Sequence, residues 1–313
     1  MLGKTAGGLF WMFRHLERSE NTARLLEAGF RMALTRSAAT EDEWASVVSA
    51  AGCKQNYSEH YADYKAVNVI DFLLRDSSNP SSVISVVKAA RDNARLVRTA
   101  LTREVWEATN ECWITLKDLL SRPIGESELP NVLGTIRQQS GLVRGALHGT
   151  MLRNDIYDFA RLGTFLERAD NTARILDVKY YVLLPSASFI GSSLDNVQWE
   201  SILRSVSAQR AYRWLNQGDS NPVWIADFLI LDRRLPRSLA FCYAKIIGNL
   251  NYLADDYAMR HPSHDLAGAT FQQLKDRPIE SIFETGLHEF LVEFIRRNTE
   301  LGIQIEQDYR FYG

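Results

Sequence analysis

The segment ERSENTARLL, residues 17–26, returns 150 residues later as ERADNTARIL, residues 167–176, with seven of ten positions identical. A helix needs apolar residues on one face in order to pack, but it does not need Glu, Arg, Asn and Arg at fixed offsets. Repetition of the polar pattern together with the apolar one therefore predicts that the chain is a duplicated helical unit.

Apolar or small residues recur every three or four positions on both sides of these segments, which is the spacing of one helix face. The two stripes are Met12, Leu16, Ser19, Ala23, Leu26, Phe30 and Ala33, and Leu162, Leu166, Ala169, Ala173, Leu176, Tyr180 and Leu183. Each stripe has two small residues at its centre, which would let another backbone approach closely. We therefore expect a pseudo-symmetric contact between the two copies at these small residues.

The rest of the chain also has helical periodicity, because its eight prolines leave long proline-free runs. Further helices are predicted over residues 61–76, 81–101, 103–120, 131–150, 223–231, 237–259 and 280–307. Clusters of Gly, Pro, Ser or Asp predict loops over residues 77–80, 121–130, 185–194, 218–222 and 261–278. The last of these loops holds His261 and His264, which we expect to be solvated. No segment has the alternation and turn signals of a sheet.

The duplication extends beyond the opening segment. Trp44 matches Trp199 at an offset of 155 residues. At an offset of 156, the matched residues are Phe72, Asp76, Pro80, Ser82 and Asn93 with Phe228, Asp232, Pro236, Ser238 and Asn249. The sequence thus predicts an all-α helical bundle, a single compact domain over residues 1–313 built from two tandem repeats, 1–150 and 151–313.

Composition limits the class of protein. With 46% hydrophobic and 24% charged residues, the 313-residue chain resembles ordinary globular proteins, and its net charge of −2 argues against nucleic acid as a partner. Three cysteines without CxxC spacing, Cys53, Cys112 and Cys242, are typical of reduced residues in the cytoplasm. No apolar run is long enough for a membrane span or an export signal. We expect a cytoplasmic protein without membrane association.

The repeated polar stripe has two interpretations. In the functional one, it forms a carboxylate-rich pocket that holds a cation, an amine or a proton, with Glu17 or Glu167 as general acid or base. In the structural one, reciprocal ion pairs such as Glu17 with Arg174 and Glu167 with Arg24 fix how the copies dock. We favour the structural one, since an arginine accompanies every carboxylate. The expected members of this inter-repeat network are Glu17, Arg18, Asn21, Arg24, Glu167, Arg168, Asn171 and Arg174.

The sequence lacks the motifs that are typical of ferritin-like metal sites and of nucleophilic catalysis. A ferritin-like site needs Glu-x-x-His on two helices, and no Glu in this chain has His three residues later. Acidic pairs such as Glu104 and Glu107 are common on exposed helices. The chain has no nucleophile elbow, phosphate-binding loop or dinucleotide-binding glycine pattern. We therefore predict neither a metal nor a cofactor.

A second constellation lies in residues 76–106, where a loop with Pro80 leads into a helix that Ser82 can cap. Lys88, Arg91, Arg95 and Arg98 then follow at spacings of three and four, and the second copy has Ala244, Ile247, Asn251 and Ala254 instead. This stripe is either a site for an anionic group or acidic partner, or a solvated face paired with nearby acids. The candidate binding residues are Ser82, Lys88, Arg91, Asn93, Arg95, Arg98 and Glu104.

Four segments in this order together resemble the bacterial alpha-E family over essentially the whole chain. They are MLGKTAGGLFWMFRHLERSENTARLL (1–26), NVIDFLLRDSSNPSSVISVVKAARDNARLVRTALTREVWEATN (68–110), ERADNTARILD (167–177) and FLILDRRLPRSLAFC (228–242). The resemblance implies an all-helical intracellular protein. Family members are often encoded beside circularly permuted ATP-grasp proteins and transglutaminase-like proteins, a setting that implies synthesis or processing of peptide or amide bonds.

The family's motif positions fall on residues of both constellations. They are Glu17, Arg18, Asn21, Arg24, Asn79, Pro80, Ser82, Arg91, Asn93, Arg95, Arg98, Glu104, Trp106, Glu167, Arg168, Asn171 and Arg174. We accordingly predict a non-catalytic accessory or substrate-binding partner of an ATP-grasp amide ligase system, which binds an acidic peptide, a phosphorylated intermediate or the ligase itself. The alternatives are an enzyme of amide-bond metabolism and a structural scaffold. The sequence does not identify the substrate, the ligand or the oligomeric state.

Overall fold

The computed structural model describes residues 1–34, 40–183, 193–216 and 221–312. Within these ranges the chain forms α-helices, one short 3-10 helix and no strand. The predicted all-α class is therefore confirmed. Also within these ranges, no helix is long and apolar enough to cross a membrane.

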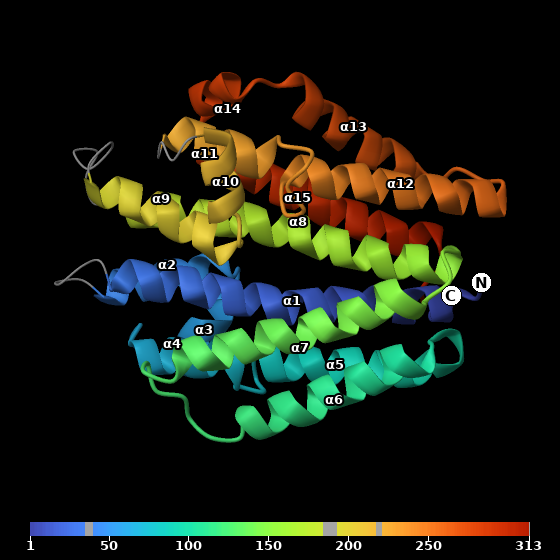
Figure 1. Ribbon diagram of the computed structural model, residues 1–313, viewed down its shortest axis with the longest axis horizontal. Coiled ribbons are helices and arrows are strands. Elements are labelled where there is room, and N and C mark those ends of the chain that lie inside the picture. Colours follow the sequence, from blue (N-terminus) through green and yellow to red (C-terminus); the bar gives the residue numbers. More distant parts are fainter. Residues whose placement is uncertain (35–39, 184–192, 217–220, 313) are drawn as a thin grey trace.

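Two long helices form the centre of the bundle, α1 (Gly3–Ala33) and α8 (Asp155–Leu183). They lie side by side and run in the same direction, and among the described residues they contact each other more extensively than any other pair (Figure 1). At Gly163 the approach is so close that a Cβ would lie 2.1 Å from the backbone oxygen of Phe10. Only glycine fits at this position.

The helices between α1 and α8 in the sequence lie on the α1 side of the bundle, except that α2 contacts both α1 and α8 (Figure 1). They are α2 (Thr40–Ala50), α3 (Lys54–His60), α4 (Ala66–Leu74), α5 (Val83–Leu96), α6 (Arg103–Leu119) and α7 (Leu129–Thr150), with a 3-10 turn, η1 (Arg98–Ala100), after α5. α5 and α7 pack directly on α1, and α6 packs on both of them. Helix α5 therefore has one apolar face on α1 and leaves another face to solvent.

The later helices cover the opposite side of α8 (Figure 1). They are α9 (Ser193–Ser205), α10 (Gln209–Asn216), α11 (Pro222–Ile230), α12 (Leu239–Tyr257), α13 (Pro262–Asp276), α14 (Ile279–Thr285) and α15 (Leu287–Asp308). α12 and α15 pack on α8, and α13 packs on α12 and α15. The central helices are thus shielded from solvent on most sides.

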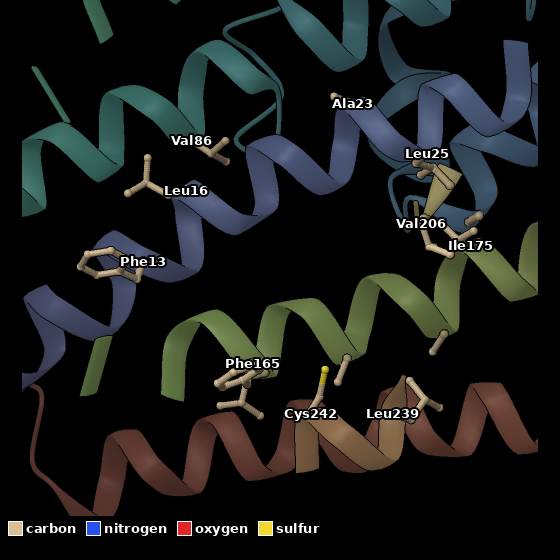
Figure 2. Close-up of a cluster of buried hydrophobic side chains, with 14 of the residues drawn as sticks. Phe13, Leu16, Ala23, Leu25, Val86, Phe165, Ile175, Val206, Leu239 and Cys242 are labelled. Atoms are coloured by element: carbon tan, nitrogen blue, oxygen red, sulfur yellow. The ribbon is translucent and has the colours of Figure 1, made fainter. Parts of the chain in front are cut away.

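Apolar side chains between these helices form one continuous core. Figure 2 shows Leu16 of α1 facing Val86 of α5, and Phe165 of α8 on the side where Cys242 of α12 lies. Cys242 and Cys112 are buried and Cys53 is half-buried, and all three are free thiols. The burial of these apolar residues supplies the main driving force for folding.

The predicted loop over residues 261–278 is wrong, because most of it is α13. Pro262 occupies the first helical turn, where the missing N–H costs nothing, and Pro278 follows the end of the helix. The prolines therefore delimit a helix. His264 is not solvated as expected: its side chain is buried, and its Nε2 lies 2.9 Å from the backbone oxygen of Leu250.

Two other boundaries differ from the prediction. The helix expected over residues 280–307 breaks at Gly286, whose φ of 98° separates α14 from α15. Of the helix expected over residues 61–76, only α4 is helical. Tyr61 and Tyr64 precede it and stack on the ring of Tyr57. Most of the two loops expected over residues 185–194 and 218–222 lies outside the described residues.

Candidate functional site

The two Glu-Arg dipeptides of the repeated segment bind each other across the contact between α1 and α8. The Nε and Nη2 atoms of Arg18 donate to the two carboxylate oxygens of Glu167 at 2.6 and 2.8 Å. In the reciprocal pair, Nε and Nη2 of Arg168 donate to Glu17 at 2.8 and 2.9 Å. Both pairs are bidentate, which is the strongest arrangement of a guanidinium with a carboxylate.

Arginines outside the repeated segments complete the network. Arg14 donates to Glu167 at 2.9 Å, and Arg144 of α7 donates to Glu17 at 3.0 Å and to Glu20 at 2.5 Å. Arg237, at the start of α12, donates to Glu20 and lies 3.3 Å from Glu17. Sequence reasoning missed Arg14, Arg144 and Arg237, because nothing in their local pattern shows that they reach this helix contact.

The carboxylates of the network are buried and stay ionised. Burial alone would raise the pKa of Glu17, but the guanidinium groups of Arg168, Arg237 and Arg144 outweigh it and hold this pKa well below its usual range. At Glu167, burial is likewise outweighed by Arg18 and Arg14, which lower the pKa to about 2. Such groups carry full charge at neutral pH.

The ion pairs expected between Glu17 and Arg174 and between Glu167 and Arg24 are wrong. Arg24 binds Glu20 of its own helix at 2.8 Å and the backbone oxygen of Ser205 at 2.7 Å. Arg174 does the same in α8, where it binds Asp170 at 2.6 Å and the backbone oxygen of Ala50 at 3.1 Å. Each of these arginines has a carboxylate one turn away on its own helix. Because Arg24 and Arg174 bind locally, the two helices are joined instead by the ion pairs of Arg18 with Glu167 and of Arg168 with Glu17.

Two asparagines fix the closest part of the helix contact. Asn21 donates from Nδ2 to the backbone oxygen of Glu167 at 3.1 Å, and Asn171 donates to the backbone oxygen of Asn21 at 3.4 Å. The small residue Ser19 does not face α8 as expected, because its hydroxyl lies 3.0 Å from that of Ser140 in α7. The polar stripe, with the asparagines at its centre, makes the contact between α1 and α8.

This arrangement limits the chemistry of the network. A general base with a pKa near 2 is weak at neutral pH, and a carboxylate held by two or more arginines has no proton to donate. Glu17 and Glu167 therefore lack the properties of the acid or base in the enzyme alternative. Among the described residues, no group of three or more His, Cys, Asp or Glu is placed to hold a metal ion.

The second constellation lies on the outer side of α5. Ser82 is fully buried, and its hydroxyl accepts from the backbone N–H of Ser85 and donates to the hydroxyl of Ser85 at 2.8 Å. Ser82 thus caps the helix and cannot itself contact a ligand, which corrects its place among the binding candidates. Lys88 is exposed and pairs with Asp92 at 2.8 Å, and Arg91 donates to Asn110 of α6 at 2.9 Å.

The remaining cations of the stripe have no carboxylate partner in the part of the chain that the structure describes. Arg95 is exposed and makes no hydrogen bond or ion pair with any described residue. Arg98, also exposed, lies over the ring of Trp106 at 5.1 Å. Asn93 donates to the backbone oxygen of its own helix at Ala89, and Glu104 is exposed in the first turn of α6. We call Arg95 and Arg98 the α5 arginine face.

Comparisons with known proteins place the chain in one family. A family model described as a predicted alpha-helical domain with a conserved ER motif matches residues 1–310. The chain contains the dipeptide Glu-Arg twice, at Glu17 with Arg18 and at Glu167 with Arg168, and these are the four residues that exchange ion pairs. No curated protein and no solved structure matches the chain.

Proposed function

The chain belongs to the alpha-E family, and we propose that it is a non-catalytic accessory protein that binds an ATP-grasp amide or peptide ligase in the cytoplasm. The contact is made by the α5 arginine face, which binds an acidic segment of the ligase or of its peptide substrate. The observation that carries this proposal is the exposed guanidinium of Arg95, which has no partner among the described residues. The partner class comes from the gene neighbourhoods of the family that the sequence resembles.

The charges of the two constellations support binding over catalysis. Glu17 and Glu167 are neutralised by arginines. On the α5 arginine face, the guanidinium of Arg98 lies over the ring of Trp106, 5.1 Å from the ring centre. A planar guanidinium held in this way suits a carboxylate or phosphate group on a partner.

We also propose that the chain consists of two helical repeats and that only the first keeps the binding face. Helices α5 and α12 both begin after a capping serine, Ser82 and Ser238, at the predicted offset of 156 residues. On α12, Asn251 and Ala254 stand at the positions that match Arg95 of α5 and Arg98 of η1, and Ala254 is buried. The repeated architecture therefore does not require the two arginines, so we assign them a role in binding rather than in folding.

A pull-down from the native cell tests the proposal. The wild-type chain is expected to capture an ATP-grasp ligase, and Arg95→Ala/Arg98→Ala is expected to lose it while keeping the thermal stability of the wild type. The matched control is Arg153→Ala/Arg210→Ala. Arg153 lies 4.0 Å from the ring centre of Tyr157, as Arg98 lies over Trp106, and Arg210 is exposed without a partner among the described residues. Because Arg153 also donates to the backbone oxygens of Met151 and His148, the thermal stability of the control pair is measured as well.

Two results contradict the proposal at different levels. Equal capture of the ligase by the wild type and by Arg95→Ala/Arg98→Ala removes the α5 arginine face as the contact. Absence of any ATP-grasp or peptide-processing protein from the wild-type capture removes the partner class. Loss of capture by the control pair as well would show a nonspecific effect of charge.

A further inference from the structure

A small cavity opens where the buried network between α1 and α8 reaches the surface. Its volume is about 250 Å³, and its walls come from α1, α8, the turn after α2, Leu73 of α4 and the residues just before α5. Exposed Gly52 lies at its rim, and Asn171 lies in its wall. Cavities for drug-sized ligands are usually larger, from about 300 Å³ upwards, so this one suits a ligand the size of an amino acid.

The charged groups of the wall are already balanced. Glu167 is held by Arg14 and Arg18, and both oxygens of Asp170 are bound by Arg174. No carboxylate of the wall is therefore free to take a cation or an amine. Burial raises the pKa of the nearby Cys53 thiol to about 11, so this thiol is not a nucleophile. The balance of charge favours a neutral ligand.

One acceptor in the wall lacks a partner. Asn171 is 5% exposed, and its Nδ2 atom is used by the backbone oxygen of Asn21. Its Oδ1 atom is buried and receives no hydrogen bond in the part of the chain that the structure describes. A buried acceptor without a partner is unfavourable, and it calls for an N–H or O–H donor from a bound molecule.

Three donors in the same wall are unused. The hydroxyls of Thr22 and Ser81 and the Nη1 atom of Arg18 make no hydrogen bond with any described residue, whereas Nε and Nη2 of Arg18 are bound to Glu167. These donors suit the oxygen of a carbonyl. One acceptor and several donors in a wall without net charge match a group that carries both an N–H and a C=O.

We propose that this cavity binds a neutral carboxamide of amino-acid size, with its N–H donated to Oδ1 of Asn171 and its carbonyl oxygen facing Arg18, Thr22 and Ser81. The inference does not depend on the ligase partnership, because it follows from the groups of the cavity wall alone. If the proposed function also holds, the ligand is an amide substrate or product of the same system.

The test measures binding of N-acetylalanine methylamide by ligand-observed NMR. Saturable binding is expected for the wild type, with a preference over N-acetylalanine, which is an anion, and over methyl 2-acetoxypropanoate, the diester that has no N–H. Asn171→Leu removes the free acceptor and is expected to weaken binding roughly tenfold or more. Asn131→Leu is the matched control, since Asn131 is exposed on α7 and its side chain makes no hydrogen bond with a described residue.

A second variant keeps the test decisive if Asn171→Leu does not fold. Thr22→Trp places a large ring in the cavity from a half-buried position and leaves every ion pair of the network in place. Loss of binding in Thr22→Trp with retention in Asn131→Leu supports the proposal. Undiminished binding in Thr22→Trp, a preference for the anion, or no saturable binding of the diamide by the wild type overturns it.

Discussion

Arginine occurs in two regions of this molecule with opposite surroundings. In the network between α1 and α8, every guanidinium described above has a carboxylate or backbone oxygen within hydrogen-bond distance. On the α5 arginine face, Arg95 has no partner among the described residues, and Arg98 has only an aromatic ring. The Glu-Arg motif that occurs in both segments lies inside the contact between α1 and α8, whereas Arg95 and Arg98, whose counterparts 156 residues later are Asn251 and Ala254, lie on the surface.

The largest expected effect is the loss of a network carboxylate. Glu17→Gln and Glu167→Gln leave two or more buried guanidinium groups without full compensation. Each substitution is expected to lower the free energy of unfolding by about 3 to 5 kcal/mol, measured by urea denaturation. Glu104→Gln, an exposed carboxylate in α6, is the control and should stay close to the wild type. Wild-type stability of Glu17→Gln would show that the network does not hold the helices together.

Lowering the pH should weaken the same contact between α1 and α8, and more gradually than the two substitutions do. The pKa of Glu167 in the folded chain is about 2, below its ordinary value of 4.5. A lowered carboxylate pKa stabilises the fold above pH 4.5, and this contribution is lost as the pH falls from 4.5 towards 2. Urea denaturation at pH 7, 4.5 and 3 should therefore show falling stability below pH 4.5, with a shallower fall in Glu167→Gln. An equal fall in both proteins would assign the acid sensitivity to other carboxylates.

The sequence predicted which helices contact each other more accurately than it predicted which side chains pair between them. The repeat of residues 17–26 at residues 167–176 located the helices that meet, because carboxylates and arginines kept at the same offsets on two helices can form reciprocal ion pairs. It did not identify the partners. Arg24 and Arg174 could reach across in principle, but each has a carboxylate four residues earlier on its own helix. Local and distant partners of a charge cannot be ranked from spacing alone.

The parts that sequence reasoning missed depend on distant packing. Arg144 and Arg237 have ordinary helical surroundings in the sequence, and only the arrangement of α7 and α12 on the central helices brings them to Glu17 and Glu20. The cavity beside Asn171 is of the same kind, since its wall comes from five separate segments. The loop expected at residues 261–278 failed for a local reason, because proline ends a helix as readily as it marks a loop.

A double-mutant cycle tests which arginine pairs with Glu167, and its expected effect on the unfolding free energy is smaller. Arg18→Ala and Glu167→Gln remove two sides of one bidentate ion pair, so their effects on unfolding free energy should fall short of additivity by about 1 to 3 kcal/mol. The cycle of Arg24→Ala with Glu167→Gln should be nearly additive, because Arg24 binds Glu20 and Ser205 instead. Strong coupling in the second cycle and none in the first would restore the pairing that the sequence alone predicted.

The smallest expected effect on stability lies on the α5 arginine face. Arg98→Ala loses a contact with Trp106 that is exposed to solvent, and a cation–π contact of this kind contributes about 0.5 to 1 kcal/mol. Arg95→Ala removes no contact with a described residue, so its unfolding free energy should stay within about 0.5 kcal/mol of the wild type. The difference in unfolding free energy between the two variants, measured by urea denaturation, shows how much the contact of Arg98 with Trp106 stabilises the fold. A loss above 1 kcal/mol in Arg95→Ala would make Arg95 a structural residue like the arginines of the network, and the argument for a free binding charge would fail.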